Sequence, residues 1–324
     1  MKTLLIINPY SRGGKSGALA KRVCRYLQDK NFSFDFTEIN NFDDAYNISV
    51  QANKDGINNI VAVGGDGTIN KVLNGFYDGN GNKISSSRFG VIHTGTSPDF
   101  CKSYNIPTNI LQAADVIMAQ HFINIPVGMI RLNTRPQKND GNTQKNPDTT
   151  KYFACCANIG LGASLARSAS SGIRGYLGDF LGTFISFLKI LFSYRGTDYS
   201  ISINSEEREV KNIINISVGI TKFIASGIKV YKDDLIPDDQ FYILKTNQIR
   251  LSELPRLIKI LYTGENFSDT SFLAKEYASK IEIRNNIIHP EVEFDGDPAG
   301  YLSCTIEIAK DRLQVFTTLD GVKR

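Results

Sequence analysis

The sequence has 324 residues, enough for one large domain or two medium ones, each with its own core. Hydrophobic residues make up 41% and charged residues 22%, which is ordinary for a globular protein. The net charge of +4 argues against a dedicated nucleic-acid binder, so no nucleic-acid partner is expected. It is compatible with weak attraction to an anionic membrane surface.

The first 120 residues alternate predicted strands with predicted helices. The predicted strands are Leu4 to Ile7, Phe32 to Ile39, Ile60 to Val63 and Phe89 to Ile92, and the predicted helices are Ser16 to Leu27, Asp43 to Asp55 and Ile69 to Phe76. This alternation predicts a Rossmann-like α/β domain with a parallel sheet over residues 1–122.

The pattern changes after about residue 122. Residues 133–151 are almost wholly polar and predict a flexible loop. Short β-rich runs then extend from Tyr152 to Thr317, interrupted by helical stretches at roughly residues 163–194 and 252–261. They predict a C-terminal β-sandwich domain over residues 123–309. Part of the tail, about residues 310–324, is expected to complete the first domain.

The five cysteines are odd in number and show no CxxC spacing, which argues against a zinc site or a disulfide framework. Free thiols in a reducing cytoplasm are the simpler interpretation. Cys155 and Cys156 fall in a predicted strand as small packing residues on opposite faces. The N-terminal apolar run, Leu4 to Ile7, is too short for a signal peptide. A soluble, cytoplasmic protein is therefore expected.

The strongest motif is VAVGGDGTINKVLNG, residues 61–75. A buried strand ends in Gly64, Gly65, Asp66, Gly67 and Thr68, and a helix begins at once. Glycines let the backbone approach a phosphate, and a helix N-terminus offers N–H groups to an anion. The Asp66 carboxylate would repel a triphosphate unless Mg²⁺ lies between them. The motif predicts a magnesium–nucleotide site, with an ordinary tight turn as the alternative. It is neither a Walker A loop nor a GxGxxG fingerprint.

This motif resembles the GGDGT signature of the family of diacylglycerol kinases, sphingosine kinases and bacterial lipid kinases. Further segments resemble that family's motifs in the same order, from residue 3 to about residue 318. They are Asn8 and Pro9 with Gly13, Gly14 and Lys15; Thr37; Gly95 and Thr96 followed by Asp99 and Lys102; and Asp295, Gly296 and Asp297.

The resemblance implies a two-domain kinase that binds ATP in the first domain and a lipid in the second. The implied nucleotide-binding residues are Asn8, Pro9, Gly13, Gly14, Lys15, Thr37, Gly64, Gly65, Asp66, Gly67, Thr68, Asn70, Gly95 and Thr96. Asp66 and Asp99 are the implied Mg²⁺ ligands, and Asp297 is the implied general base on the lipid hydroxyl. Asp295 and Lys102 are further catalytic candidates.

A second, non-catalytic Mg²⁺ site is implied at the acidic cluster around residue 237. Its candidate ligands are the Asp239 side chain and the carbonyl groups of Ile236 and Phe241. A solvated loop is the alternative there.

The sequence departs from the family's pattern at several positions. Lys71 stands where Glu is common, and Ser97-Pro98 replaces Gly-Asn. Lys102 keeps the charge of an arginine but loses its bidentate fork. His93 precedes the loop where an apolar residue or proline is usual. Without a recognisable Ser or Cys partner, His93 is interpreted as a loop residue near the nucleotide rather than a base. The late motif is DGD in place of DGE.

Residues 175–194 carry apolar side chains at helical spacing, from Leu177 to Leu191. They predict either a lipid-facing surface for transient membrane contact or an ordinary core helix. The lipid itself is not specified by the sequence, and a homodimer is compatible with it.

Two other functions compete with lipid phosphorylation. NAD kinases share GGDGT but place an Asn-Glu pair downstream of it, and this sequence has none. A catalytically weak, nucleotide-binding regulator of lipid metabolism would account for the departures.

Overall fold

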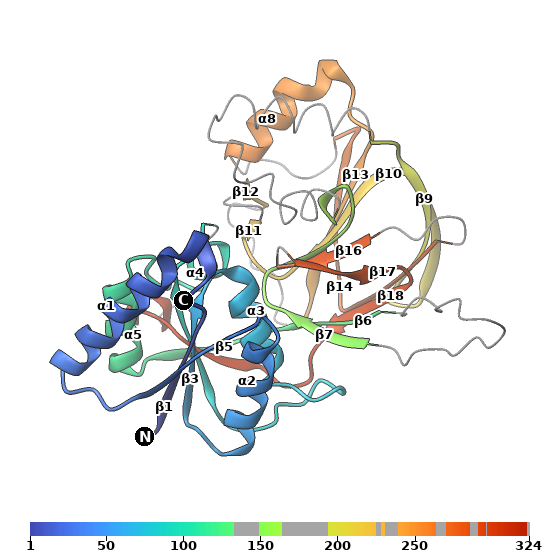
Figure 1. Cartoon of the computed structure of the whole chain (residues 1–324). Coiled ribbons are helices and arrows are strands. Elements are labelled where there is room, and N and C mark those ends of the chain that lie inside the picture. Colours follow the sequence, from blue (N-terminus) through green and yellow to red (C-terminus); the bar gives the residue numbers. More distant parts are fainter. Residues whose placement is uncertain are drawn as a thin grey trace, which may run out of the picture.

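The computed structural model describes residues 1–96, 98–132, 149–163, 194–224, 228–230, 239–263, 270–285, 291–295 and 297–322. The elements gather into two domains that lie against each other (Figure 1). Most of the predicted flexible loop, residues 133–148, and most of the apolar segment 175–194 lie outside the described residues.

The first domain contains a six-stranded sheet with the order β2-β1-β3-β4-β19-β5. Its strands are β1 (Thr3–Ile7), β2 (Asp35–Glu38), β3 (Asn59–Gly64), β4 (Arg88–His93), β5 (Phe122–Ile125) and β19 (Leu313–Phe316). The β5 strand runs antiparallel to β19, and the other pairs are parallel. The β3 strand is buried along its whole length, as expected where helices cover both faces of a parallel sheet.

Helices cover both faces of this sheet. They are α1 (Lys15–Asp29), α2 (Asp44–Lys54), α3 (Asp66–Asn74) and α5 (Ile110–Ala119), with the short helices η1 (Ser11–Gly14), α4 (Asp99–Ser103) and α9 (Leu319–Val322). The α1 helix buries a stripe from Ser16 to Leu27 at helical spacing. The α3 helix begins at Asp66, three residues before its predicted start, so Asp66 lies in the first turn.

The second domain is built from antiparallel strands. They are β6 (Gly128–Leu132), β7 (Thr149–Phe153), β8 (Cys156–Gly160), β9 (Thr197–Ile203), β10 (Glu206–Gly219), β13 (Phe241–Asn247), β14 (Leu273–Ala278), β15 (Lys280–Arg284), β16 (Glu291–Phe294), β17 (Asp297–Tyr301) and β18 (Cys304–Ile308). A separate two-stranded sheet contains β11 (Phe223–Ile224) and β12 (Ile228–Lys229), and η3 (Leu251–Glu253) leads into α8 (Leu254–Thr263).

These strands form one continuous eleven-stranded sheet that curls around its own core (Figure 1). Branched aliphatic residues from one face fill that core, among them Ile159, Ile201, Ile216 and Ile283. The predicted fold class, a Rossmann-like α/β domain followed by a C-terminal β-sandwich, is confirmed, and the β domain is formed by one curled antiparallel sheet. The predicted strand from Tyr152 to Ile159 is divided into β7 and β8. The first sheet includes β5 and β19, while the division at residues 122 and 123 stays a prediction.

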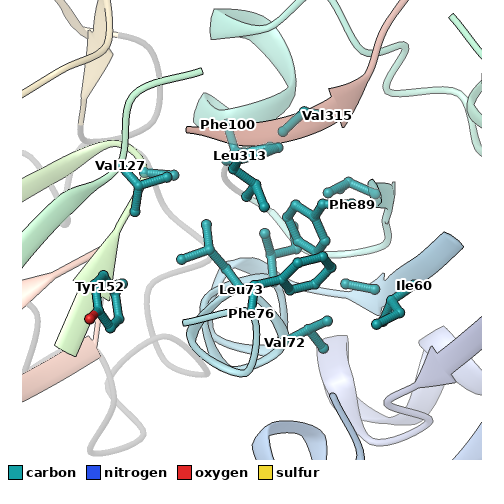
Figure 2. Packing of buried hydrophobic residues seen from close by; sticks show 14 of the residues in the cluster. Ile60, Val72, Leu73, Phe76, Phe89, Phe100, Val127, Tyr152, Leu313 and Val315 are labelled. Atoms are coloured by element: carbon teal, nitrogen blue, oxygen red, sulfur yellow. The ribbon is translucent and has the colours of Figure 1, made fainter. Parts of the chain in front are cut away.

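The two domains share one hydrophobic cluster centred on α3 (Figure 2). Leu73 of α3 and Phe76, just beyond the end of that helix, lie in this cluster with Val127 and Tyr152 of the second domain. The rings of Tyr152 and Tyr77 stack with centroids 4.6 Å apart. Packing on both sides of α3 therefore fixes the helix that carries the GGDGT motif at the domain junction.

Candidate active site

The central loop joins β3 to α3 and brings glycine backbone to a helix N-terminus. The strand ends at Gly64, Gly65 caps the helix, and Asp66 is half-buried in its first turn. A Cβ atom on Gly64 would lie 2.6 Å from the Thr68 side chain, so a larger residue there would displace Thr68. An anion placed at this end of α3 would meet N–H groups and the positive end of the helix dipole.

Asn8 ties the loop after β1 to the central loop. Its backbone N–H donates to the Val63 carbonyl at 2.9 Å, and its side-chain amide donates to Oγ1 of Thr68 at 2.9 Å. Gly13 and Gly14 have φ angles of +65° and +85°, in the left-handed region that favours glycine. This loop therefore runs beside the GGDGT backbone, in a conformation that depends on its glycines.

Three other predicted residues flank this loop. The Pro9 carbonyl accepts from the Gly17 N–H at 3.2 Å, and Lys15 is exposed at the start of α1. Thr37 is half-buried on β2 and pairs with Ile6 of β1. Because β1 and β2 are parallel, Thr37 lies toward the same edge of the sheet as the loop after β1.

The loop after β4 closes against the central loop. The Thr94 N–H donates to the Gly64 carbonyl at 2.8 Å, and Oγ of Ser16 donates to Oγ1 of Thr94 at 2.8 Å. A Cβ atom on Gly95 would lie 2.8 Å from Cα of Gly65, so the two backbones touch at these glycines. Loops from three neighbouring strands thus form one continuous, backbone-lined surface at the carboxyl edge of the sheet.

A groove of about 290 Å³ borders the loop after β4. Leu19 and Arg22 of α1 form one wall, and the loop residues from His93 to Thr96 form another. Thr96 is exposed. The groove therefore gives solvent access to this part of the loop.

The α4 helix carries the two charged residues predicted after this loop. Asp99 is its first residue and is half-buried, while Lys102 is exposed one turn later. Ser97 lies outside the described residues. The α4 helix contacts β11 of the second domain, so Asp99 and Lys102 lie near the domain junction.

Asp295 connects the second domain to α3. Its Oδ2 accepts from the Asn70 side-chain amide and from the Ala154 N–H, both at 2.9 Å. Its Oδ1 accepts from the N–H groups of Cys155 and Cys156 at 2.9 and 3.2 Å. Burial raises the pKa of Asp295 to about 6, against the four hydrogen bonds, which lower it. With both oxygens engaged, this carboxylate joins β16, the turn between β7 and β8, and α3.

Carboxylates from both domains act on the pKa of the Cys155 thiol. Burial raises the pKa of this thiol well above its ordinary value, and the negative charges of Asp295, Asp66 and Asp99 raise it further. These three carboxylates therefore lie within electrostatic reach of one buried sulfur atom.

Two predicted features fall partly on residues outside the described ranges. Asp297 begins β17 and pairs with Phe294 of β16, but its side chain lies outside the description, as does Gly296. At the second metal site Ile236 is likewise outside it, Asp239 is exposed, and Phe241 begins β13. Within the described ranges, no group of three or more His, Cys, Asp or Glu side chains is arranged to hold a metal ion.

Lys71, one of the departures from the family pattern, is held on the surface between α2 and α3. Its Nζ lies 2.5 Å from Oδ1 of Asp43 and 5.3 Å from the centre of the Phe42 ring. The Lys71 ammonium group is thus paired with the Asp43 carboxylate.

Sequence reasoning missed a polar row in the second domain. Asn158 donates to Glu293, and Oγ of Ser217 donates to Oδ1 of Asn158 at 2.5 Å. The three residues pair directly across β16, β8 and β10, and Glu293 is only 5% exposed. Polar residues alternating with buried aliphatic ones in these strands were the available signal.

Comparisons with known proteins agree with the resemblance seen in the sequence. A family model described as the diacylglycerol kinase catalytic domain matches residues 2–130. A diacylglycerol kinase from Staphylococcus carnosus (strain TM300) is 25% identical over 261 residues, covering 81% of this chain and 77% of that protein. One from Staphylococcus aureus (strain Newman) is 24% identical over 263 residues, covering 81% and 75%.

Solved structures show the same fold. A diacylglycerol kinase from Bacillus anthracis str. Sterne matches with a TM-score of 0.66 and 18% identity, over 99% of this chain and 98% of that one. An NAD kinase from Archaeoglobus fulgidus, in complex with ATP, matches with a TM-score of 0.50 and 12% identity, over 100% and 96%. The family resemblance is confirmed, and the structural likenesses support the fold.

Proposed function

We propose that this chain, whose residues 2–130 match a family model of the diacylglycerol kinase catalytic domain, is an ATP-dependent lipid kinase. It transfers the γ-phosphoryl group of ATP to a hydroxyl of a lipid such as diacylglycerol. The observation that carries this proposal is the meeting of three glycine-containing loops beside Asp66, at a junction where Asp99 and Asp295 also lie.

The glycine-lined surface fits a nucleotide's phosphates. The absence of side chains at Gly64 and Gly95 lets the loops pack closely against Thr68 and Gly65, and the amide end of α3 lies at the same surface. We propose that Thr37 of the neighbouring strand and Asn8, whose side-chain amide donates to Thr68, line the same surface. Phosphoryl transfer depends mainly on such positioning and on charge stabilisation.

Asp66 and Asp99 fit a Mg²⁺ ion, because each offers a half-buried carboxylate in the first turn of a helix. Magnesium commonly uses one or two carboxylates with phosphate and water oxygens, so a cage of three protein ligands is not required. When bound, the ion supplies positive charge between these carboxylates and the phosphates. The helix ends hold the two carboxylates in place for that role.

Asp297 is the proposed general base. The neighbouring Asp295 is bound by four donors and serves to hold the β16–β17 turn against α3. As the lipid oxygen bonds to the γ-phosphorus, the bond from that phosphorus to the bridging oxygen breaks, and the hydroxyl proton passes to Asp297. The exposed ammonium group of Lys102 is proposed to attract the phosphate charge.

A lipid kinase must reach a substrate that lies in a membrane. No helix in the described ranges is long and apolar enough to cross a membrane. We propose transient contact of a cytoplasmic protein with the membrane surface, and a homodimer is compatible with the proposal. A second, non-catalytic Mg²⁺ site at residues 236, 239 and 241 is part of the same proposal.

An NAD kinase is the second candidate, because the Archaeoglobus fulgidus enzyme shares the fold. A nucleotide-binding regulator without turnover is the third. The three are distinguished by measuring ADP release from Mg·ATP with mixed membrane lipids, with NAD, and with neither. We expect release that depends on lipid. Release dependent on NAD, or nucleotide binding with no release, would contradict the proposal.

A further inference from the structure

His93 is buried beside the carboxylate proposed to bind Mg²⁺. It is the last residue of β4, and its side chain is 4% exposed. Its Nε2 lies 3.5 Å from Oδ1 of Asp66. Among the residues that the structure describes, this buried nitrogen has no hydrogen-bond partner. Buried polar atoms are usually hydrogen-bonded, so the unbonded Nε2 beside the Asp66 carboxylate requires an explanation.

The imidazole of His93 lies against the backbone where two loops meet. A Cβ atom on Gly95 would lie 3.1 Å from Nε2 and 2.8 Å from Cα of Gly65. The imidazole is thus packed against the glycine contact between the two loops. Its Nε2 faces the first turn of α3, where Asp66 begins the helix.

The 3.5 Å separation is longer than the roughly 2.7–3.2 Å of a formed N–H···O bond. Hydrogen bonds in active sites are often long without ligand and shorten when it binds. A rotation of the half-buried Asp66 side chain would close the gap. No change of protonation is needed, because a neutral imidazole with its proton on Nε2 already donates.

We propose that His93 is a positioning residue for Asp66: its Nε2–H donates to Oδ1 and holds the carboxylate toward Mg²⁺ and the nucleotide. This inference rests on the proposed function and deepens it. In the resembling family the approach to this loop is usually apolar or contains proline, whereas this chain has His93 and Thr94 there, so the proposed hydrogen bond is a feature of this chain's own sequence.

The test uses two variants of matched shape. Gln in His93→Gln can place an amide N–H near the position of Nε2, whereas Met in His93→Met has a similar shape and no donor. Binding of ADP to the full chain is measured with and without Mg²⁺. We expect Mg²⁺ to tighten ADP binding in the wild type and in His93→Gln. In His93→Met, that tightening should fall about tenfold, while Mg²⁺-free ADP binding stays unchanged.

Retention of the full Mg²⁺ effect in His93→Met would overturn the inference and leave the proposed kinase intact. If the wild-type chain binds no ADP with Mg²⁺, the proposed function fails, and this inference fails with it.

A second measurement stands even if His93→Met does not fold. In ¹⁵N-histidine-labelled wild-type protein at pH 8, His93 should carry its proton on Nε2. Its Nε2 resonance should shift in Asp66→Ala, while the signals of the other two histidines stay fixed. A proton on Nδ1 instead, or an Nε2 signal indifferent to Asp66→Ala, would refute the positioning role without reference to activity.

Discussion

Replacing Asn70 by Ala removes one donor from the carboxylate that joins the two domains. The Asn70 amide donates to Oδ2 of Asp295 at 2.9 Å and to the Tyr152 carbonyl at 3.0 Å. The Tyr152 carbonyl keeps a second donor, the Asn74 amide at 2.8 Å. The loss therefore falls mainly on Asp295.

A hydrogen bond to a charged group contributes roughly 1.5–3 kcal/mol. Ala is a better helix former than Asn by up to about 0.7 kcal/mol, which offsets part of the loss. We expect Asn70→Ala to lower the free energy of unfolding by roughly 1–2.5 kcal/mol at pH 8. That corresponds to a fall in the unfolding midpoint of about 2–10 °C for a domain of this size.

The loss should depend on pH because Asp295 titrates. Burial raises the pKa of Asp295 from 3.8 to about 6, so the contribution of Asp295 to the stability of the chain falls as the pH rises through that window. At pH 5 most of the folded protein carries a protonated Asp295, and the Asn70 bond becomes a neutral one of roughly 0.5–1.5 kcal/mol. The effect of Asn70→Ala should therefore shrink at pH 5.

Asn74→Ala is the matched control on the same helix. Asn74 bonds to both the N–H and the carbonyl of Tyr152 and donates to Oδ1 of Asn70 at 2.9 Å, and within the part of the chain that the structure describes it makes no hydrogen bond to Asp295 itself. Its destabilisation, measured by thermal or urea unfolding, should be equal at pH 5 and pH 8. Equal pH dependence in the two variants, or a larger loss for Asn70→Ala at pH 5, would refute the role assigned to Asp295.

Four other outcomes are expected. Asp66→Asn should abolish phosphoryl transfer with an unfolding midpoint close to that of the wild type, and retained activity would remove its magnesium role. Gly95→Ala should lower the free energy of unfolding by roughly 1–3 kcal/mol, because its Cβ would meet Cα of Gly65 at 2.8 Å. A Cβ on Gly65 has its nearest contact at 3.6 Å, so Gly65→Ala should keep a thermal unfolding midpoint close to that of the wild type. Asp297→Asn should lose nearly all turnover but keep ATP affinity, and Asp297→Glu should stay active; normal turnover by Asp297→Asn would place the base elsewhere. Lys71→Ala should change the free energy of unfolding by less than about 1 kcal/mol and leave turnover unchanged, since its ion pair with Asp43 lies on the surface.

The local parts of the site could be predicted from the sequence. A buried strand, a run of glycines and a helix lie consecutively between residues 59 and 74, so their geometry follows from neighbouring residues. The backbone contact between Gly65 and Gly95 also follows from two adjacent strands ending at the same edge of a sheet. Periodicity is enough to recognise such elements.

The long-range parts could not be predicted. The bond from Asn70 to Asp295 joins residues 225 positions apart, and no local pattern specifies that pairing. The same holds for the single curled sheet, because alternation shows which side chains face a core but not which strands are neighbours. His93 stood out in the sequence as a departure, yet only the folded chain shows its nitrogen aimed at Asp66.

Identification of the phosphorylated product tests the central claim most directly. The purified chain is incubated with Mg²⁺, ATP labelled at the γ-phosphate and a total lipid extract, and the labelled product is identified. We expect the label on a lipid hydroxyl, with diacylglycerol as the first acceptor to examine, and no label in the Asp66→Asn reaction. A wild-type chain that binds Mg·ATP but labels no lipid, or that labels NAD instead, would contradict the account.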